Sequence, residues 1–135
     1  MQETSGLIPK NLEFADKARE KLIKGINKIA DAVGSTLGPS GQTVLIESPH
    51  HTHGITVTKD GVTVASAIDL LDPVENLAVR MVKEAAERTA TSAGDGTTTS
   101  IVLTRAFVEE GMKVLSSHPN KTELLRKLQL EVDKV

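Results

Sequence analysis

Four stretches of the chain place apolar residues three and four positions apart, which is the spacing of one face of an α-helix. They cover about residues 11–33, 74–89, 97–115 and 124–135. The first stretch carries charged residues on its opposite face, and its apolar positions are Phe14, Ala18, Leu22, Ile26, Ile29, Ala30 and Val33. The pattern predicts a mainly helical domain.

The later three helices differ in how we expect them to begin and pack. Asp72 suits an N-cap, Pro73 the first helical position and Glu75 the third, so a helix should begin here. Its alanine-rich stripe predicts close packing against another helix. The next helix is apolar on nearly all sides, which predicts a central, buried position. Asn120 and Glu123 form a cap pair for the last helix, which has no stop signal, so we expect an interrupted domain.

Two short β-prone runs lie between the first two helices. Residues 43–47 and 55–58 are separated by a polar loop, which predicts a β-hairpin. Residues 62–71 fit either a strand or a short helix. The predicted fold class is therefore mainly α with one small β-hairpin.

Composition and charge narrow the class of protein. The 135 residues are 39% hydrophobic and 25% charged, with a net charge of -2, as in a soluble globular domain. That charge gives no electrostatic reason to expect nucleic acid or a membrane as a partner. No apolar run is long enough to span a bilayer. The absence of cysteine excludes disulfides and thiolate metal sites, and it fits a reducing, cytoplasmic location.

The most distinctive stretch joins the second and third of these helices and reads Gly94-Asp95-Gly96-Thr97-Thr98-Thr99-Ser100. The unpaired N–H groups and positive dipole of a helix N-terminus bind phosphate, and an adjacent aspartate suits Mg²⁺. Local chemistry alone slightly favours an ordinary corner, with Gly94 as one helix's C-cap and Asp95 as the next helix's N-cap. That interpretation leaves three consecutive threonines unexplained, since threonine is a mediocre helix former.

Two further loops carry candidate phosphate ligands. Residues 34–41 contain three glycines and Pro39, and such a loop presents backbone N–H groups to an anion. A plain connecting loop is the simpler interpretation. Lys59 and Asp60 follow the second β-prone run, where they suit a terminal phosphate and its metal. Asp60-Gly61 is also a common hairpin turn, and local sequence favours the turn.

The loop of the predicted hairpin contains three histidines. His51 and His53 would share one face of a strand as a metal pair, with His50 beside them. No carboxylate or cysteine lies nearby, so exposed loop histidines are the favoured interpretation.

Three motifs occur in a specific order along the chain: Thr36-Leu37-Gly38-Pro39-x-Gly41, Thr58-Lys59-Asp60-Gly61-Val62 and Ala93-Gly94-Asp95-Gly96-Thr97-Thr98-Thr99. Their order and spacing resemble the nucleotide-binding motifs of the chaperonins, the GroEL-like ring ATPases. The resemblance runs from about Phe14 to the end of the chain. Lys59 makes the second motif resemble that of group I chaperonins, because group II chaperonins usually have Asn at this position. The resemblance implies that residues 1–135 form an incomplete equatorial-domain-like helical bundle, without the intermediate and apical domains.

The resemblance also implies ATP and Mg²⁺ as ligands, with a role for each motif. The first motif would contact the nucleotide and its phosphates through Thr36, Leu37, Gly38 and Pro39. Lys59 would lie near the phosphates. Asp60 would act catalytically near the γ-phosphate and its metal-linked water, at the start of a short helix that replaces the local hairpin-turn interpretation.

The resemblance implies that the third motif completes the phosphate site. Asp95 would hold Mg²⁺, and the phosphate oxygens would be bound at the helix N-terminus by Gly96, Thr97, Thr98 and Thr99. Ser40 departs from the family, which usually has Lys there. The stem-loop over about residues 43–58 is slightly longer than usual.

The leading hypothesis is an ATP-binding segment of a chaperonin that uses ATP binding and hydrolysis to assist the folding of non-native polypeptides. Its partners would be those polypeptides and neighbouring ring subunits reached by the stem-loop; a GroES-like co-chaperonin stays open. The segment alone should not turn over ATP, because the family's water-activating aspartate lies outside it. The alternative is a truncated, non-enzymatic interaction module or pseudo-subunit, and a third possibility is a helical scaffold without a nucleotide role.

Overall fold

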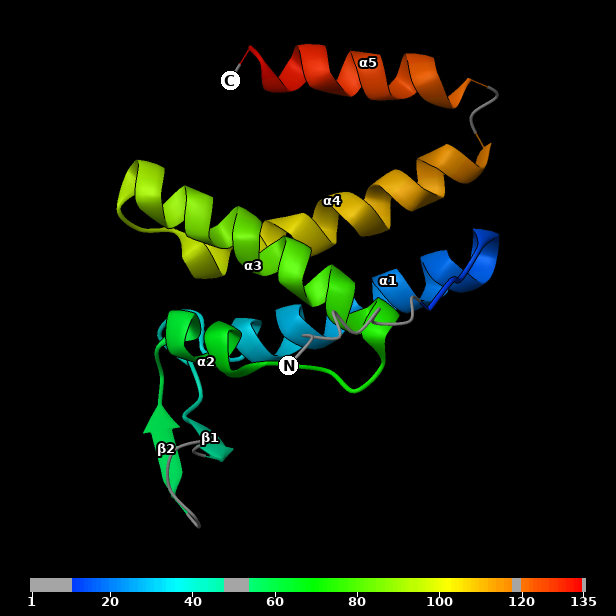
Figure 1. Ribbon diagram of the computed structural model, residues 1–135. Helices are drawn as coiled ribbons and strands as arrows, with labels where there is room; N and C mark the ends of the chain where they lie inside the picture. Colours follow the sequence, from blue (N-terminus) through cyan, green and yellow to red (C-terminus); the bar gives the residue numbers. More distant parts are fainter. Residues whose placement is uncertain (1–10, 48–53, 118–119, 135) are drawn as a thin grey trace, which may run out of the picture.

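The computed structural model describes residues 11–47, 54–117 and 120–134. Within them the chain forms five helices and one two-stranded antiparallel sheet (Figure 1). The elements in chain order are α1 (Ala15–Gly34), β1 (Val44–Glu47), β2 (Ile55–Thr58), α2 (Gly61–Ala67), α3 (Pro73–Ala93), α4 (Thr97–Ser117) and α5 (Lys121–Val132). The predicted fold class, mainly α with a small hairpin, is confirmed.

The core lies where α1, α2, α3 and α4 meet, and β1 packs against its edge. It consists of small aliphatic side chains, namely Ile29, Ala30, Val33, Val64, Ala65, Val79, Val82, Ala86 and Ile101. Small side chains let helices approach closely. A Cβ at Gly25 of α1 would lie 2.2 Å from the Glu75 carbonyl oxygen of α3, so the two helices cross nearly in backbone contact. The close packing predicted from the alanine stripe is confirmed.

The caps of α3 and α5 agree with the local sequence. The Asp72 carboxylate accepts hydrogen bonds from the N–H groups of Val74 (2.8 Å) and Glu75 (3.1 Å), with proline at the first helical position. The Asn120 side chain accepts one from the Glu123 N–H at 3.1 Å. Both predicted N-caps are confirmed.

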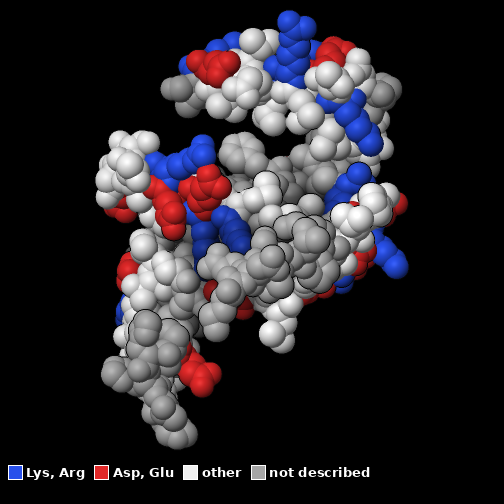
Figure 2. Space-filling model, viewed as in Figure 1, with Lys and Arg blue, Asp and Glu red and all other residues white. Residues whose placement is uncertain are grey.

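The predicted burial of α4 is wrong over most of its length. Its buried residues are Thr97 and Ile101, both in its first two turns. Farther along, Leu103 is 49% exposed and Phe107 is 62% exposed. The helix packs against α1, α3 and the short α2, and no described residue of α5 is buried. A hollow separates α5 from the helices beneath it (Figure 2). The apolar pattern therefore predicted the helix correctly, but the described part of the chain does not cover most of its apolar surface.

The hairpin presents two different faces. Leu45 pairs with Val57, and both are exposed on one face. Val44 and Ile46 alternate with Leu45 and pack against the core. The sheet is therefore held by one face and leaves an apolar face outward. The histidine cluster in its loop lies outside the described residues.

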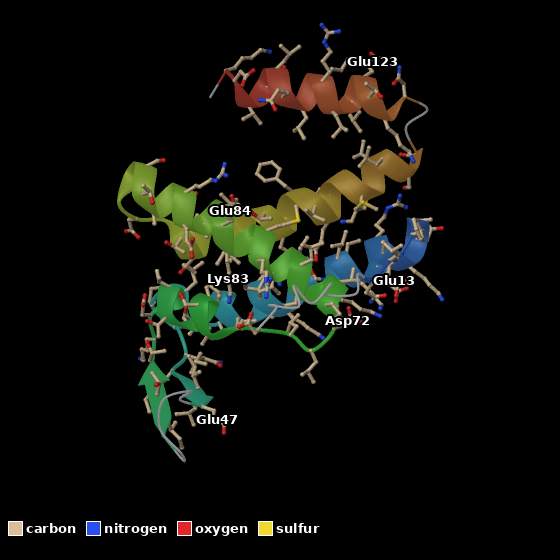
Figure 3. All side chains as sticks on the ribbon, viewed as in Figure 1. Glu13, Glu47, Asp72, Lys83, Glu84 and Glu123 are labelled. Atoms are coloured by element: carbon tan, nitrogen blue, oxygen red, sulfur yellow. The ribbon has the colours of Figure 1, made fainter. Side chains whose placement is uncertain are left out.

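The segment after Asp60 is helical. Residues 61–67 form α2 with Asp60 as its N-cap, so the hairpin-turn interpretation of Asp60-Gly61 is wrong and the helix implied by family resemblance is confirmed. Val64 and Ala65 are buried, and the Lys83 ammonium of α3 donates to the Ser66 carbonyl oxygen at 3.0 Å (Figure 3). Seven residues are too few for a helix to persist alone, so these tertiary contacts hold α2 in place.

Candidate functional site

The corner between α3 and α4 is built on two glycines with left-handed backbone. Gly94 has a φ of 78° as the C-cap of α3, as predicted, and Gly96 has a φ of 92°. A side chain would strain either position. The Gly96 carbonyl accepts the Ser100 N–H at 2.8 Å, directly before α4 begins at Thr97. Gly96 therefore occupies the cap position, and the interpretation of Asp95 as the N-cap of α4 is wrong.

Asp95 lies one residue before that cap, with its side chain exposed. Its carboxylate accepts the Gly96 N–H at 2.6 Å. The first N–H groups of α4 have no intrahelical partner, and the dipole of this long helix is positive at this end. An anionic ligand and its cation can both be accommodated here, because fixed N–H donors stand beside an accessible carboxylate.

The three threonines at the start of α4 face different surroundings. Thr97 is only 7% exposed and belongs to the core region. The Thr98 hydroxyl lies against Gly61 of α2. Thr99 lines an open groove of about 520 Å³, together with Asp95 and Gly96. The three consecutive threonines therefore have three different surroundings.

The loop after α1 folds back tightly on itself. The Thr36 hydroxyl donates to the Val33 carbonyl at 2.7 Å, and the Gly41 N–H donates to the Gly38 carbonyl at 3.0 Å. Gly38 has a φ of 78°, and a Cβ at Gly41 would lie 2.3 Å from the Thr36 carbonyl oxygen. The sharp loop predicted for residues 34–41 is confirmed, with Leu37, Gly38 and Pro39 exposed on its surface.

The Asp60 carboxylate is held by three donors at the start of α2. Its Oδ1 accepts the Val62 N–H at 3.3 Å, and its Oδ2 accepts both the N–H (3.0 Å) and the hydroxyl (2.6 Å) of Thr63. These hydrogen bonds, that of the Thr63 hydroxyl first, hold the pKa of Asp60 below its usual value. Lys59 beside it is exposed and forms no ion pair within the described part of the chain. Lys59 and Asp60 are therefore adjacent in the chain and both exposed, and neither forms an ion pair with another described residue.

Gly61 is the point at which the three sequence motifs meet. A Cβ at this buried glycine would lie 2.1 Å from the Thr98 hydroxyl oxygen and 3.2 Å from the Thr36 hydroxyl oxygen. The Lys59-Asp60-Gly61 turn, the loop beginning at Thr36 and the start of α4 are thereby packed together. The 520 Å³ groove lies on another side of α4 and includes neither Thr36 nor Asp60.

The described residues were also compared with the features of metal sites, membrane spans and charged binding surfaces. Residues 11–47, 54–117 and 120–134 contain no cluster of three His, Asp or Glu side chains suited to a metal. Asp95 is a single carboxylate, so it fits a cation shared with ligand oxygens. No helix of the described chain is long and apolar enough to cross a membrane. Acidic and basic side chains are interspersed on the face in Figure 2, without a patch of one sign.

Sequence reasoning missed two participants. Thr63 lies outside the three motifs, yet its N–H and its hydroxyl group both donate to the Asp60 carboxylate. The signal that could have found it is Asp60 itself, because a capping aspartate is expected to accept the N–H three residues on. The steric role of Gly61 had no local signal, because Thr98 and Thr36 reach it from distant parts of the chain.

The chain matches known proteins along most of its length. Residues 29–135 match the model of the TCP-1/cpn60 chaperonin family. The chain is 36% identical to the chaperonin gp146 from the bacteriophage EL 2 (Pseudomonas aeruginosa), crystallised in the presence of ATP-BeFx, with a TM-score of 0.65. That match covers 78% of this chain and 18% of gp146. A second crystal form of gp146 matches equally well.

A group III chaperonin in the open state is also similar, with 27% identity and a TM-score of 0.72. This match covers 87% of the present chain and 23% of the group III protein. The chain therefore spans less than a quarter of the length of each of these chaperonins.

Proposed function

The chain belongs to the TCP-1/cpn60 chaperonin family, and we propose that it forms the N-terminal segment of the equatorial, ATP-binding domain of a group I-type chaperonin. The whole protein would bind and hydrolyse ATP with Mg²⁺ and use these steps to assist the folding of non-native polypeptides. Lys59 supports group I within the family, since it matches the residue usual there. A cytoplasmic location is part of the same proposal.

One observation carries the nucleotide proposal: the contact of Gly61 with both Thr98 and Thr36. Three motifs that are distant in sequence meet at this glycine. Each suits a phosphate–metal ligand for a different reason: a glycine-rich loop and a helix N-terminus present backbone N–H groups to phosphate, and the Lys-Asp pair offers an ammonium for phosphate and a carboxylate for its metal or water. A structural corner would not require all three to converge.

The donors fit an ATP–Mg²⁺ ligand. Backbone N–H groups at the start of α4 would bind phosphate oxygens, and Lys59 would add a positive charge. Exposed Asp95 would hold Mg²⁺ together with phosphate oxygens, since Mg²⁺ is usually held by few protein carboxylates plus substrate phosphate. The bound cation would supply neutralisation of phosphate charge during transfer.

Asp60 would stand beside the γ-phosphate as an ionised carboxylate. The hydrogen bonds that lower its pKa keep it an acceptor, so it would orient water or a water-bound group. Activation of the attacking water in this family depends on an aspartate in the intermediate domain. We therefore expect the 135 residues to bind nucleotide without turning it over.

The hairpin is suited to subunit contact. Its exposed face carries Leu45 and Val57, and an apolar strand face outside the core favours a protein partner. We propose that this partner is a neighbouring subunit of a ring. Co-chaperonin use stays outside this proposal.

Isothermal titration of ATP into the full-length gene product, with and without Mg²⁺, tests the proposal. We expect binding that depends on Mg²⁺ and weakens at least tenfold in Asp95→Ala. Asp16→Ala is the matched control, because Asp16 is an exposed aspartate paired with Arg19 at the start of α1. Binding unchanged in Asp95→Ala, or equally weakened in both variants, would refute the role of Asp95. An absence of ATP binding by the wild type would refute the nucleotide proposal itself.

A non-enzymatic interaction module is the second candidate, and the exposed apolar faces of α4 and α5 favour it. Under this candidate, the gene product would end near residue 135 and bind another chain. The intact mass of the natural protein and ATP titration distinguish the candidates: a short product without ATP binding supports the module.

A further inference from the structure

We propose that Thr63 is a positioning residue, whose hydroxyl group fixes which oxygen of the Asp60 carboxylate is presented to the nucleotide. This inference rests on the proposed function, in which Asp60 stands beside the γ-phosphate. Thr63 lies outside the three motifs that carry the resemblance to chaperonins, and its contribution emerges from the geometry of the α2 cap.

The two oxygens of the Asp60 carboxylate are unequally engaged. Oδ2 accepts the Thr63 hydroxyl at 2.6 Å and the Thr63 N–H at 3.0 Å. Oδ1 accepts the Val62 N–H at 3.3 Å, near the long limit for a hydrogen bond. The strongest donor to the carboxylate is therefore the side chain of Thr63.

The unequal use of the two oxygens determines which of them can accept a hydrogen bond from a ligand. A carboxylate oxygen has two acceptor positions, and both positions on Oδ2 are filled by Thr63. Oδ1 retains a free position and a weakly used one. A ligand or water approaching Asp60 thus meets Oδ1 as the available acceptor. Without the hydroxyl, Oδ2 would have a vacant position, and the carboxylate could bind the same ligand in two orientations.

The support beneath this cap is rigid. Val64 and Ala65 are buried in the core, and Lys83 holds the last turn of α2 through the Ser66 carbonyl. Gly61 lies against Thr98 at the start of α4. With the backbone of α2 held at both ends, the carboxylate can still rotate about its own side-chain bonds, against the hydrogen bonds from the N–H groups of Val62 and Thr63. The Thr63 hydroxyl restrains that rotation.

The local electrostatics are simple. Hydrogen bonds from Thr63 and Val62 lower the pKa of Asp60, and no charged side chain of the described residues contributes to the shift. Removing the Thr63 hydroxyl therefore changes the main stabilising contact of the anion and leaves the neighbouring charges as they are.

The matched pair Thr63→Val and Thr63→Ser tests the inference in the full-length gene product. Valine keeps the branched shape and removes the hydroxyl, whereas serine keeps the hydroxyl. Thr63 is exposed, so neither change leaves a cavity. We expect Thr63→Val to lower kcat roughly tenfold, the size expected for a lost hydrogen bond to a charged group. ATP–Mg²⁺ affinity should change less than twofold, and Thr63→Ser should behave as wild type.

A second readout needs no nucleotide. The Asp60 carboxyl carbon, followed by NMR against pH in the ligand-free protein, should titrate at a higher pKa in Thr63→Val than in wild type or Thr63→Ser. If Thr63→Val fails to fold, Thr63→Ala removes the same hydroxyl and replaces it in both measurements.

The outcomes separate the two proposals. Wild-type protein without ATPase activity refutes the proposed function, and the inference then falls with it. Active wild type with equal kcat in the valine and serine variants refutes the role of Thr63 alone. A proportional loss of affinity, stability and kcat in Thr63→Val, with no change in the Asp60 titration, also refutes it, because that result describes an ordinary helix cap.

Discussion

Substitution of Gly61 by alanine tests the contact that joins the three motifs. The added Cβ would lie 2.1 Å from the Thr98 hydroxyl oxygen, whereas real Cβ contacts essentially never fall below 3.0 Å. The backbone of α2 or the side chain of Thr98 must therefore move by about 0.9 Å. Gly61 does not have a positive φ, so the clash is the main unfavourable effect of the alanine.

Two opposing effects determine how much Gly61→Ala destabilises the fold. Overpacking of a buried site lowers the free energy of unfolding by about 1–3 kcal/mol. Replacing a helical glycine by alanine raises it by about 0.5–1 kcal/mol. The clash wins, and we expect Gly61→Ala to destabilise the chain by about 1–2 kcal/mol. Gly111 of α4 is the matched control, because a Cβ there meets nothing within 4 Å. Gly111→Ala should stabilise the chain by about 0.5–1 kcal/mol.

Urea unfolding followed by circular dichroism, at one fixed chain concentration, measures both changes. A double-mutant cycle then identifies the cause. Removing the hydroxyl with Thr98→Ala should restore most of the stability lost in Gly61→Ala, because the atom at 2.1 Å is gone. A Gly61→Ala variant as stable as Gly111→Ala, or one unaffected by Thr98→Ala, would refute the reasoning about this contact.

Three further predictions follow from other contacts. The Lys21 ammonium forms ion pairs with both Glu13 and Asp72, each at 2.9 Å, and its hydrogen bond lowers the pKa of Asp72. A lowered carboxyl pKa stabilises the fold above its ordinary value of 3.8, and this stability is lost as pH falls through the folded pKa. In Lys21→Met, the free energy of unfolding measured by urea titration should therefore fall less steeply with decreasing pH below 3.8 than in the wild type. The same pH dependence in both proteins would contradict this prediction. Lys83→Met should speed amide hydrogen exchange in α2 and leave α5 unchanged, because it removes the bond to the Ser66 carbonyl; equal rates in α2 would exclude this anchor. The 135-residue chain should self-associate in sedimentation velocity through the exposed apolar faces of α4 and α5, and a single monomeric species would count against an incomplete domain.

Several elements could be predicted from the sequence because their causes are local. Asp72 and Asn120 cap their helices through N–H groups two or three residues away, so the signal and its partner lie in the same short stretch. Gly94 ends α3 by the left-handed backbone that glycine adopts readily. The hairpin followed from two β-prone runs and a polar loop.

The start of α2 needed more than local sequence. Asp60-Gly61 is compatible with both a hairpin turn and a helix start, and the same aspartate serves either. Burial of Val64 and Ala65 against the core selects the helix. The resemblance to chaperonins indicated the helix correctly, and composition or periodicity alone did not.

The sequence by itself determined that the segments of α1, α3, α4 and α5 are helical, where most of these helices begin, and which three motifs are candidates for phosphate binding. Tertiary structure alone decided that these motifs meet at Gly61, that Thr97, Thr98 and Thr99 have different surroundings, and that most of α4 is exposed. The physical reason is range: caps and periodicity act within a few residues. The space around a glycine and the covering of a helix depend on which distant segments pack against it.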